Sequence, residues 1–220
     1  IFADLKNNLE KAISYLEDKK NESLSNDAND FFFVSKDVAR ILLANIYMYQ
    51  AEYGLAEKLL SDVIGTGFYE LDPSNYSDKG TITDLWKNGS GKETIFATRS
   101  DREESQTYGD ITIVTPACVP MMTYADVILS YAECLYKNGK IAESETELEK
   151  VTSNKGIIVS GGNVLEKIKD ARSQLMLYSS TNFAFMKRNG FAKDFYGIED
   201  YRQLLPIPQG ALESQQNPGY

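Results

Sequence analysis

One spacing of small and apolar residues, present twice, constrains the fold of this chain most. Each copy has small, aromatic or apolar side chains at relative positions 0, 3, 12, 16 and 19. The first copy is Ala44, Tyr47, Ala56, Leu60 and Val63, and the second is Ala132, Leu135, Ser144, Leu148 and Val151. Small residues at such positions let two paired helices approach closely. We therefore predict two helical hairpins, at residues 34–64 and 121–152.

The same spacing resembles the tetratricopeptide repeat, but the two copies are not in tandem. Ala44 and Ala132 are 88 residues apart, whereas tandem copies follow at about 34 residues. Residues 65–120 form an insertion rich in Gly, Ser, Asp and Thr, with strand-like runs at 94–97 and 111–114. The predicted fold is mainly all-α: tetratricopeptide-like hairpins, turning at 52–54 and 138–139, with a long irregular insertion carrying short strands.

Helical patterns also flank the hairpins. Apolar residues recur every three or four positions from Leu5 to Leu16, so the chain opens inside a helix. Either upstream sequence is missing or the natural N-terminus is short. Ser35 and Asn163 are predicted N-caps, whose side chains accept from free amides of the first helical turn. Residues 164–178 and the helix that follows are expected to form a closing hairpin over the repeats, and 189–197 a loop.

Composition excludes several classes of partner. The net charge of −9 disfavours nucleic acid and anionic membrane surfaces, because binding to phosphates rests on Lys and Arg. No apolar run approaches the ~20 residues that span a bilayer, and the first residues do not resemble a signal peptide. Cys118 and Cys134 have no metal-ligand spacing, and the sequence leaves open whether they pair.

Catalytic residues are not evident in the sequence. The chain has no histidine, which removes the commonest general base and most transition-metal sites. Carboxylates alone could hydrolyse glycosides, but the run 101–104 is typical of a solvated loop, and Asp126 and Glu133 are expected to cap helices or pair with cations. We predict a protein that is not an enzyme and holds neither cofactor nor metal.

Aromatic side chains are the better indication of binding. The sequence contains 14 Tyr, 10 Phe and one Trp, and a sugar ring can stack on such surfaces while polar neighbours bind its hydroxyls. Three aromatic residues of the insertion are candidate ligand-binding residues: Tyr76, Trp86 and Tyr108. Core packing is the competing interpretation for Trp86. The helical residues Tyr47, Tyr49 and Tyr131 are expected to pack within the repeats.

Several motifs resemble the SusD/RagB family of outer-membrane nutrient-binding lipoproteins. The C-terminal Leu205-Pro206-Ile207-Pro208 followed by Gln216-Asn217-Pro218-Gly219-Tyr220 is similar to the signature that closes these proteins. Glu93-Thr94-Ile95-Phe96 and the helix Tyr124-Ala125-Asp126-Val127-Ile128-Leu129 are similar to internal family motifs. The sequence departs from the family at Thr123, where Arg is common, and in lacking the Arg-Trp-Phe-Asp-Leu helix. At 220 residues it is also about half of a typical member.

The resemblance implies a single SusD-like domain over residues 1–220, or the C-terminal portion of one. It implies a surface-exposed lipoprotein of the cell outer membrane, anchored upstream of this chain, that binds glycan or another nutrient without catalysis. The expected partner is a SusC-like TonB-dependent transporter, to which the nutrient is delivered. The alternative is a tetratricopeptide-type scaffold for protein–protein interaction, which would need contiguous repeats.

Overall fold

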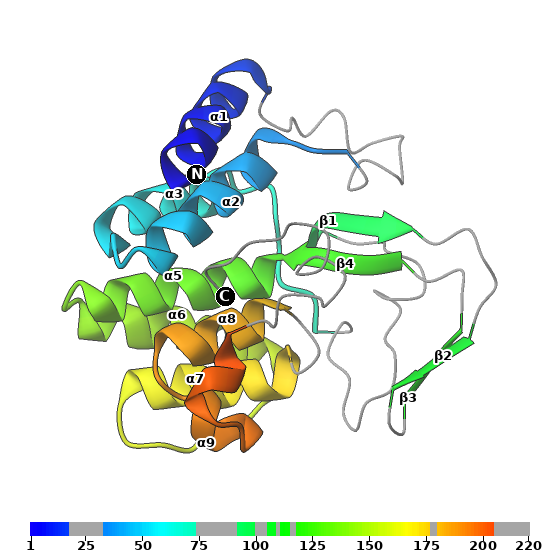
Figure 1. The fold of residues 1–220 in the computed structure, drawn as a ribbon, viewed down its shortest axis with the longest axis vertical. Coiled ribbons are helices and arrows are strands. Elements are labelled where there is room, and N and C mark those ends of the chain that lie inside the picture. The colour runs from blue at the N-terminus through cyan, green and yellow to red at the C-terminus, as the bar shows by residue number, and fades with distance from the viewer. Residues whose placement is uncertain are drawn as a thin grey trace, which may run out of the picture. The chain divides into compact units, whose positions relative to one another are not determined.

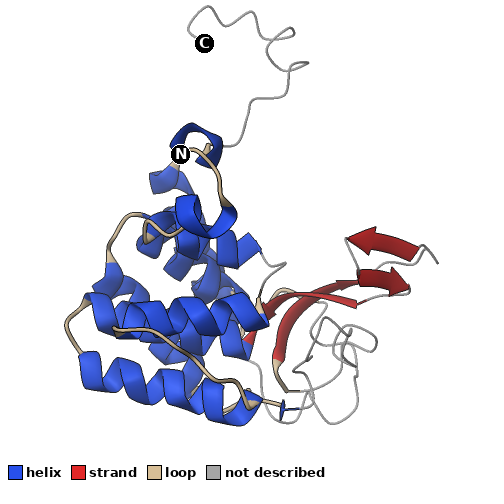
Figure 2. Ribbon diagram, turned by 90° about the horizontal axis from the view of Figure 1, so that it is seen from below, coloured by secondary structure: helices blue, strands red, loops and turns tan. Residues whose placement is uncertain are grey.

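The structure is a computed structural model that describes residues 1–17, 33–73, 92–99, 105–108, 111–114, 118–176 and 180–204. Helices make up most of this part of the chain (Figures 1 and 2), which confirms the predicted fold class. None of the described helices has the length and apolar character needed to cross a bilayer. The chain separates into two compact units, residues 1–177 and 178–220.

The first predicted hairpin consists of α2 (Lys36–Tyr49) and α3 (Tyr53–Gly65). Ala44, Ala56 and Val63 are fully buried, and Leu60 is almost so, because the two small residues let the helices approach. Burying a side chain such as Leu60 contributes about 1.5–3 kcal/mol. The turn lies before the predicted 52–54, because Tyr53 already begins α3 and Ala51 has a left-handed φ of 59°.

The second predicted hairpin consists of α5 (Tyr124–Lys137) and α6 (Ile141–Lys155), with its turn at Asn138 and Gly139 as expected. Ala132, Ser144 and Val151 are fully buried. The Ser144 hydroxyl donates to the Ala132 carbonyl at 2.6 Å. A serine can therefore occupy this position, where the repeat requires a small residue, without leaving its hydroxyl unpaired. The repeated spacing therefore has the same structural meaning in both copies.

The two hairpins stack through α3 and α5 (Figure 1). At the edge of this contact the Glu57 carboxylate accepts from Asn138 Nδ2 at 2.6 Å and from Lys140 Nζ at 2.5 Å. These bonds join the start of α3 to the turn of the second hairpin. The repeats are neighbours in space although the insertion separates them in sequence.

Two further helices of the first unit extend the stack. The first, α1 (Phe2–Tyr15), packs on α2 and has no buried residue of its own. At the other end α7 (Val164–Leu175) packs on α5 and α6, and Asn163 caps it with Glu166 in a reciprocal capping box, as predicted. Ser35 is the residue before α2, but its buried hydroxyl makes no capping bond, so that part of the prediction is wrong.

The insertion carries two small antiparallel sheets. Strand β1 (Thr94–Arg99) pairs with β4 (Cys118–Thr123), and β2 (Ser105–Tyr108) pairs with β3 (Ile111–Val114). The runs 94–97 and 111–114 are the strand-like segments found in the sequence. Strand β4 leads directly into α5, so the sheet β1–β4 is attached to the second hairpin.

The second unit contains α8 (Ser180–Arg188), α9 (Ala192–Tyr196) and a 3-10 turn, Asp200–Gln203. The prediction of a loop over 189–197 is wrong, because 192–196 are helical and Gly197 ends the helix with φ 62°. The proline-rich C-terminal motif at 205–220 lies outside the described residues.

Candidate functional site

The base of the insertion is a compact hydrogen-bonded structure, which we call the insertion neck: residues 70–72, 92–93 and 123–124. The segment that leads into the insertion contacts the segment that returns from it, because the Glu70 amide donates to the Lys92 carbonyl at 3.2 Å. The side chains of the same two residues form an exposed ion pair. The Tyr124 amide, the first of α5, donates to the Glu93 carbonyl at 2.8 Å.

Glu93 is the centre of the neck. Its Oε2 atom accepts from the Asp72 amide at 2.8 Å and from Lys155 Nζ at 2.5 Å. Lys155 Nζ also donates to the Asp72 carbonyl at 2.7 Å. The side chains of Lys155 and Glu93 are only 2% and 3% exposed. The last residue of α6 is thereby connected to both the entry and the return of the insertion.

Buried contacts fix the segment that leads from α3 into the neck. Phe68 and Tyr69 lie in the core cluster. The Tyr69 hydroxyl donates to Asp37 Oδ2 at 3.1 Å, and Arg40 Nη1 donates to Asp37 Oδ1 at 2.8 Å. The neck is therefore tied to α2 through this segment and to α6 through Lys155.

The three predicted ligand-binding residues are not seen together in the described part of the chain. Tyr76 and Trp86 lie outside the described residues. Tyr108 is the last residue of β2, where its backbone pairs with Ile111, and the structure describes nothing of its side chain. In the sequence Tyr76 and Trp86 lie between the neck residues Asp72 and Lys92. All three residues remain predictions.

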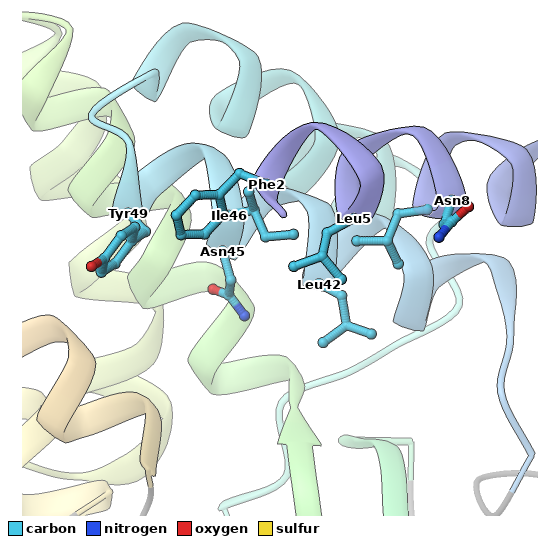
Figure 3. Close-up of a pocket in the computed structure, with 8 residues that line it drawn as sticks. Phe2, Leu5, Asn8, Leu42, Asn45, Ile46 and Tyr49 are labelled. Atoms are coloured by element: carbon cyan, nitrogen blue, oxygen red, sulfur yellow. The ribbon is translucent and has the colours of Figure 1, made fainter. Parts of the chain in front are cut away.

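An apolar groove of about 530 Å³ lies between α1 and α2 (Figure 3). Its walls are Phe2, Leu5, Asn8, Leu9, Leu42, Asn45, Ile46 and Tyr49. The rings of Phe2 and Tyr49 meet at 5.5 Å between centroids. Tyr49 is 63% exposed, so the prediction that it packs within the repeats is wrong, whereas Tyr47 and Tyr131 do pack against the core.

Asp126 of α5 makes a structural contact. Asp126 Oδ1 accepts from Arg172 Nη1 of α7 at 2.7 Å, and Arg172 Nη2 donates to Ser130 Oγ at 2.7 Å. Asp126 thus pairs with a cation, as the sequence predicts. Glu133 is fully buried in α5. Among the described residues no group of His, Cys, Asp or Glu has the arrangement of a metal site, and Cys134 is buried in α5.

Shifts in pKa also have structural causes. Burial alone would raise the pKa of Glu57, but the hydrogen bonds from Lys140 and Asn138 outweigh it and lower that pKa. Burial, followed by the negative charge of Glu147, raises the pKa of Tyr124. Each shift occurs where helices or hairpins meet and follows from the contacts made there.

Comparison with known proteins identifies the fold. Neither protein-family models nor curated proteins gave a match, but solved structures did. Surface glycan-binding protein A from Bacteroides thetaiotaomicron is 15% identical with a TM-score of 0.71, over 98% of this chain and 68% of that one. A SusD superfamily protein from the same organism is 16% identical with a TM-score of 0.72, over 98% and 64%. The chain has a SusD-like fold.

A third SusD-like structure, from Bacteroides vulgatus, is 18% identical with a TM-score of 0.67, over 100% of this chain and 65% of that one. The chain thus spans about two thirds of the length of these SusD-like proteins. The matches cover 98–100% of this chain. They support the resemblance that the motifs at 93–96 and 124–129 indicate.

Proposed function

We propose that this SusD-like chain binds glycan without catalysis. The observation that carries the proposal is its fold, which it shares with proteins named surface glycan-binding protein A; one of these, from Bacteroides thetaiotaomicron, was solved in complex with laminarihexaose. The candidate contacts are Tyr76, Trp86 and Tyr108 of the insertion, because aromatic faces stack on sugar rings. The tetratricopeptide scaffold is not favoured, because the solved structures that this chain matches are surface glycan-binding and SusD superfamily proteins.

Calorimetric titration with laminarihexaose, cellohexaose and maltohexaose tests glycan binding. We expect saturable heat with at least one hexasaccharide, and weaker binding after Trp86→Ala, Tyr76→Ala or Tyr108→Ala. Tyr15→Ala is the matched control, because Tyr15 is an exposed aromatic residue of α1, outside the insertion. No heat with any of the three sugars, or equal losses in the control, would contradict the proposal.

The proposed biological setting is the cell outer membrane. The chain would be part of a surface lipoprotein whose lipid anchor lies upstream of residue 1, and would deliver its glycan to a SusC-like TonB-dependent transporter. Support comes from the family motifs and the shared fold. Affinity purification of the tagged protein from the native membrane should recover such a transporter in stoichiometric amount. Recovery of the protein alone under mild detergent would count against this setting.

A further inference from the structure

The groove between α1 and α2 has the size and the lining of a ligand-binding site. Its volume of about 530 Å³ lies within the range of pockets that bind small ligands, about 300–1,000 Å³. Such pockets are mostly apolar, with a few polar groups that orient the ligand. Of the eight residues that line this groove, four are aliphatic, two are aromatic and two are asparagines.

The aromatic residues lie at one end of the groove and the asparagines along the rest of it (Figure 3). The rings of Phe2 and Tyr49 are inclined by 32° to each other, and the two residues are 41% and 63% exposed, so both leave surface open to a ligand. Asn45 lies between this aromatic end and Leu42, and Asn8 lies at the other end. The amides of both asparagines have no hydrogen-bond partner in the described part of the chain, so each can donate to and accept from a hydroxyl group.

The groove is also uncharged. None of its lining residues is ionisable except Tyr49, although a quarter of the residues in the whole sequence are charged. Two charged residues of α1 make their contacts elsewhere: Lys6 Nζ donates to Glu52 Oε1 at 3.4 Å, and Glu10 Oε1 accepts from the Tyr47 hydroxyl at 3.4 Å. A charged ligand would lose hydration in this groove without gaining a counter-charge. The lining is therefore complementary to a neutral ligand.

We propose that the groove between α1 and α2 is a binding site for a neutral glycan chain. Phe2 and Tyr49 supply the aromatic surface on which a sugar ring stacks, and Asn8 and Asn45 bond its hydroxyls. From Phe2 to Asn8 the site extends about 9 Å along α1, at about 1.5 Å per residue, so it holds a short part of a longer glycan. This inference rests on the proposed function and adds to it a site outside the insertion.

Calorimetric titration of groove variants with laminarihexaose, cellohexaose and maltohexaose tests the site. Tyr49→Ala should bind the preferred hexasaccharide about tenfold more weakly, because an aromatic residue at the centre of a contact contributes strongly to affinity. Tyr49→Phe keeps the ring and should bind nearly as tightly as the wild type. Asn45→Leu keeps the size of the side chain but removes its amide, and should weaken binding about fivefold.

Tyr15→Ala is the matched control for these variants. Tyr15 is an exposed tyrosine of α1, as Tyr49 is of α2, but it does not line the groove. This substitution should leave the dissociation constant unchanged. Thermal melts followed by circular dichroism should show that every variant is folded, since each change lies at an exposed or half-buried position.

Nuclear magnetic resonance locates the contact independently of any substitution. The side-chain amide signals of Asn8 and Asn45 should shift as the hexasaccharide is added, whereas that of Asn163, which caps α7, should not. Unchanged signals from Asn8 and Asn45 at saturating sugar would overturn the site.

Failure of this site and failure of the proposed function give different results. No heat with any of the three hexasaccharides would overturn both. Binding that Trp86→Ala weakens and Tyr49→Ala leaves unchanged would overturn the groove site alone. Sedimentation velocity tests the other occupant, a second copy of this chain: a dimer that Tyr49→Ala dissociates would show that protein covers the groove, and would overturn glycan binding there.

Discussion

Asp126→Ala is predicted to destabilise the first unit strongly, because it removes a carboxylate that a buried cation bonds. The Arg172 side chain is 1% exposed, and its guanidinium bonds Asp126 at 2.7 Å and Ser130 at 2.7 Å. Removing one partner of a buried pair typically costs about 3–5 kcal/mol. Asp126 also lies in the first turn of α5, where a negative charge contributes about 0.3–1 kcal/mol.

The side chain of Asp126 is 15% exposed, so water can reach part of the space that the substitution opens. We therefore expect a loss near the lower end of the range for a buried pair, about 3 kcal/mol. Arg172→Met should cost less, because the carboxylate that remains lies nearer to water and the methionine fills the space of the arginine stem. The double variant should be more stable than the sum of the two losses predicts, with a coupling energy of about 1–3 kcal/mol.

Urea denaturation followed by circular dichroism at the helical band measures all four proteins of this cycle. Lys150→Ala is the control, because Lys150 pairs with Glu147 at 2.6 Å but is 52% exposed, and a surface pair contributes little. If Asp126→Ala lost no more stability than Lys150→Ala, or if the substitutions at Asp126 and Arg172 were additive, the argument from burial would be refuted.

Two further predictions concern backbone conformation and pH. Ala51 and Gly156 both have left-handed φ values, 59° and 63°. Because this region costs an L side chain about 1–2 kcal/mol, Ala51→Gly should raise the melting temperature and Gly156→Ala should lower it. Calorimetric scans in which both variants shifted the melting temperature in the same direction would contradict this reasoning. Burial would raise the pKa of Glu57 in the folded state, but hydrogen bonds from Lys140 and Asn138 to its carboxylate lower that pKa on balance. The ionised carboxylate therefore stabilises the fold above the unfolded-state pKa, and this stabilisation is lost as the pH falls through the folded-state pKa. Glu57→Gln should be less stable than the wild type near pH 7 and equally stable below both pKa values of Glu57. Urea titration at several pH values measures this difference in unfolding free energy, and a difference that grew as the pH fell would contradict the prediction.

The hairpins could be predicted because their information is local. Small residues lie where the two helices of each hairpin approach, namely Ala44 and Ala56 in the first and Ala132 and Ser144 in the second. Both pairs have the same spacing in the sequence. Asn163 could be predicted for the same reason, since a capping box lies within four residues. The prediction for Tyr49 failed because apolar periodicity identifies the face of a helix, while exposure depends on which helix covers that face, and α1 leaves the Tyr49 ring largely open.

Strands β2 and β4 had no such local pattern. Strand β4 contains Pro120 and two methionines, which indicate no strand by themselves. It forms because β1 lies beside it, Ala97 being paired with Pro120 and Thr98 with Val119. These paired residues are more than twenty positions apart in the sequence. Their pairing depends on the path of the chain between them, which cannot be predicted from local patterns in a single sequence. The same limit applies to the candidate ligand-binding residues Tyr76, Trp86 and Tyr108.

The neck is the clearest case of information that only the fold supplies. Lys155 is separated by 62 residues from Glu93, and at the end of a helix a lysine is sufficiently explained by the dipole. In the fold it closes the base of the insertion. The return strand and the start of α5 also meet at Glu93, because the Tyr124 amide donates to the Glu93 carbonyl. Beyond the neck the insertion also packs on the repeats, since Ile95 of β1 is fully buried in the core cluster with Val38 and Ile41 of α2.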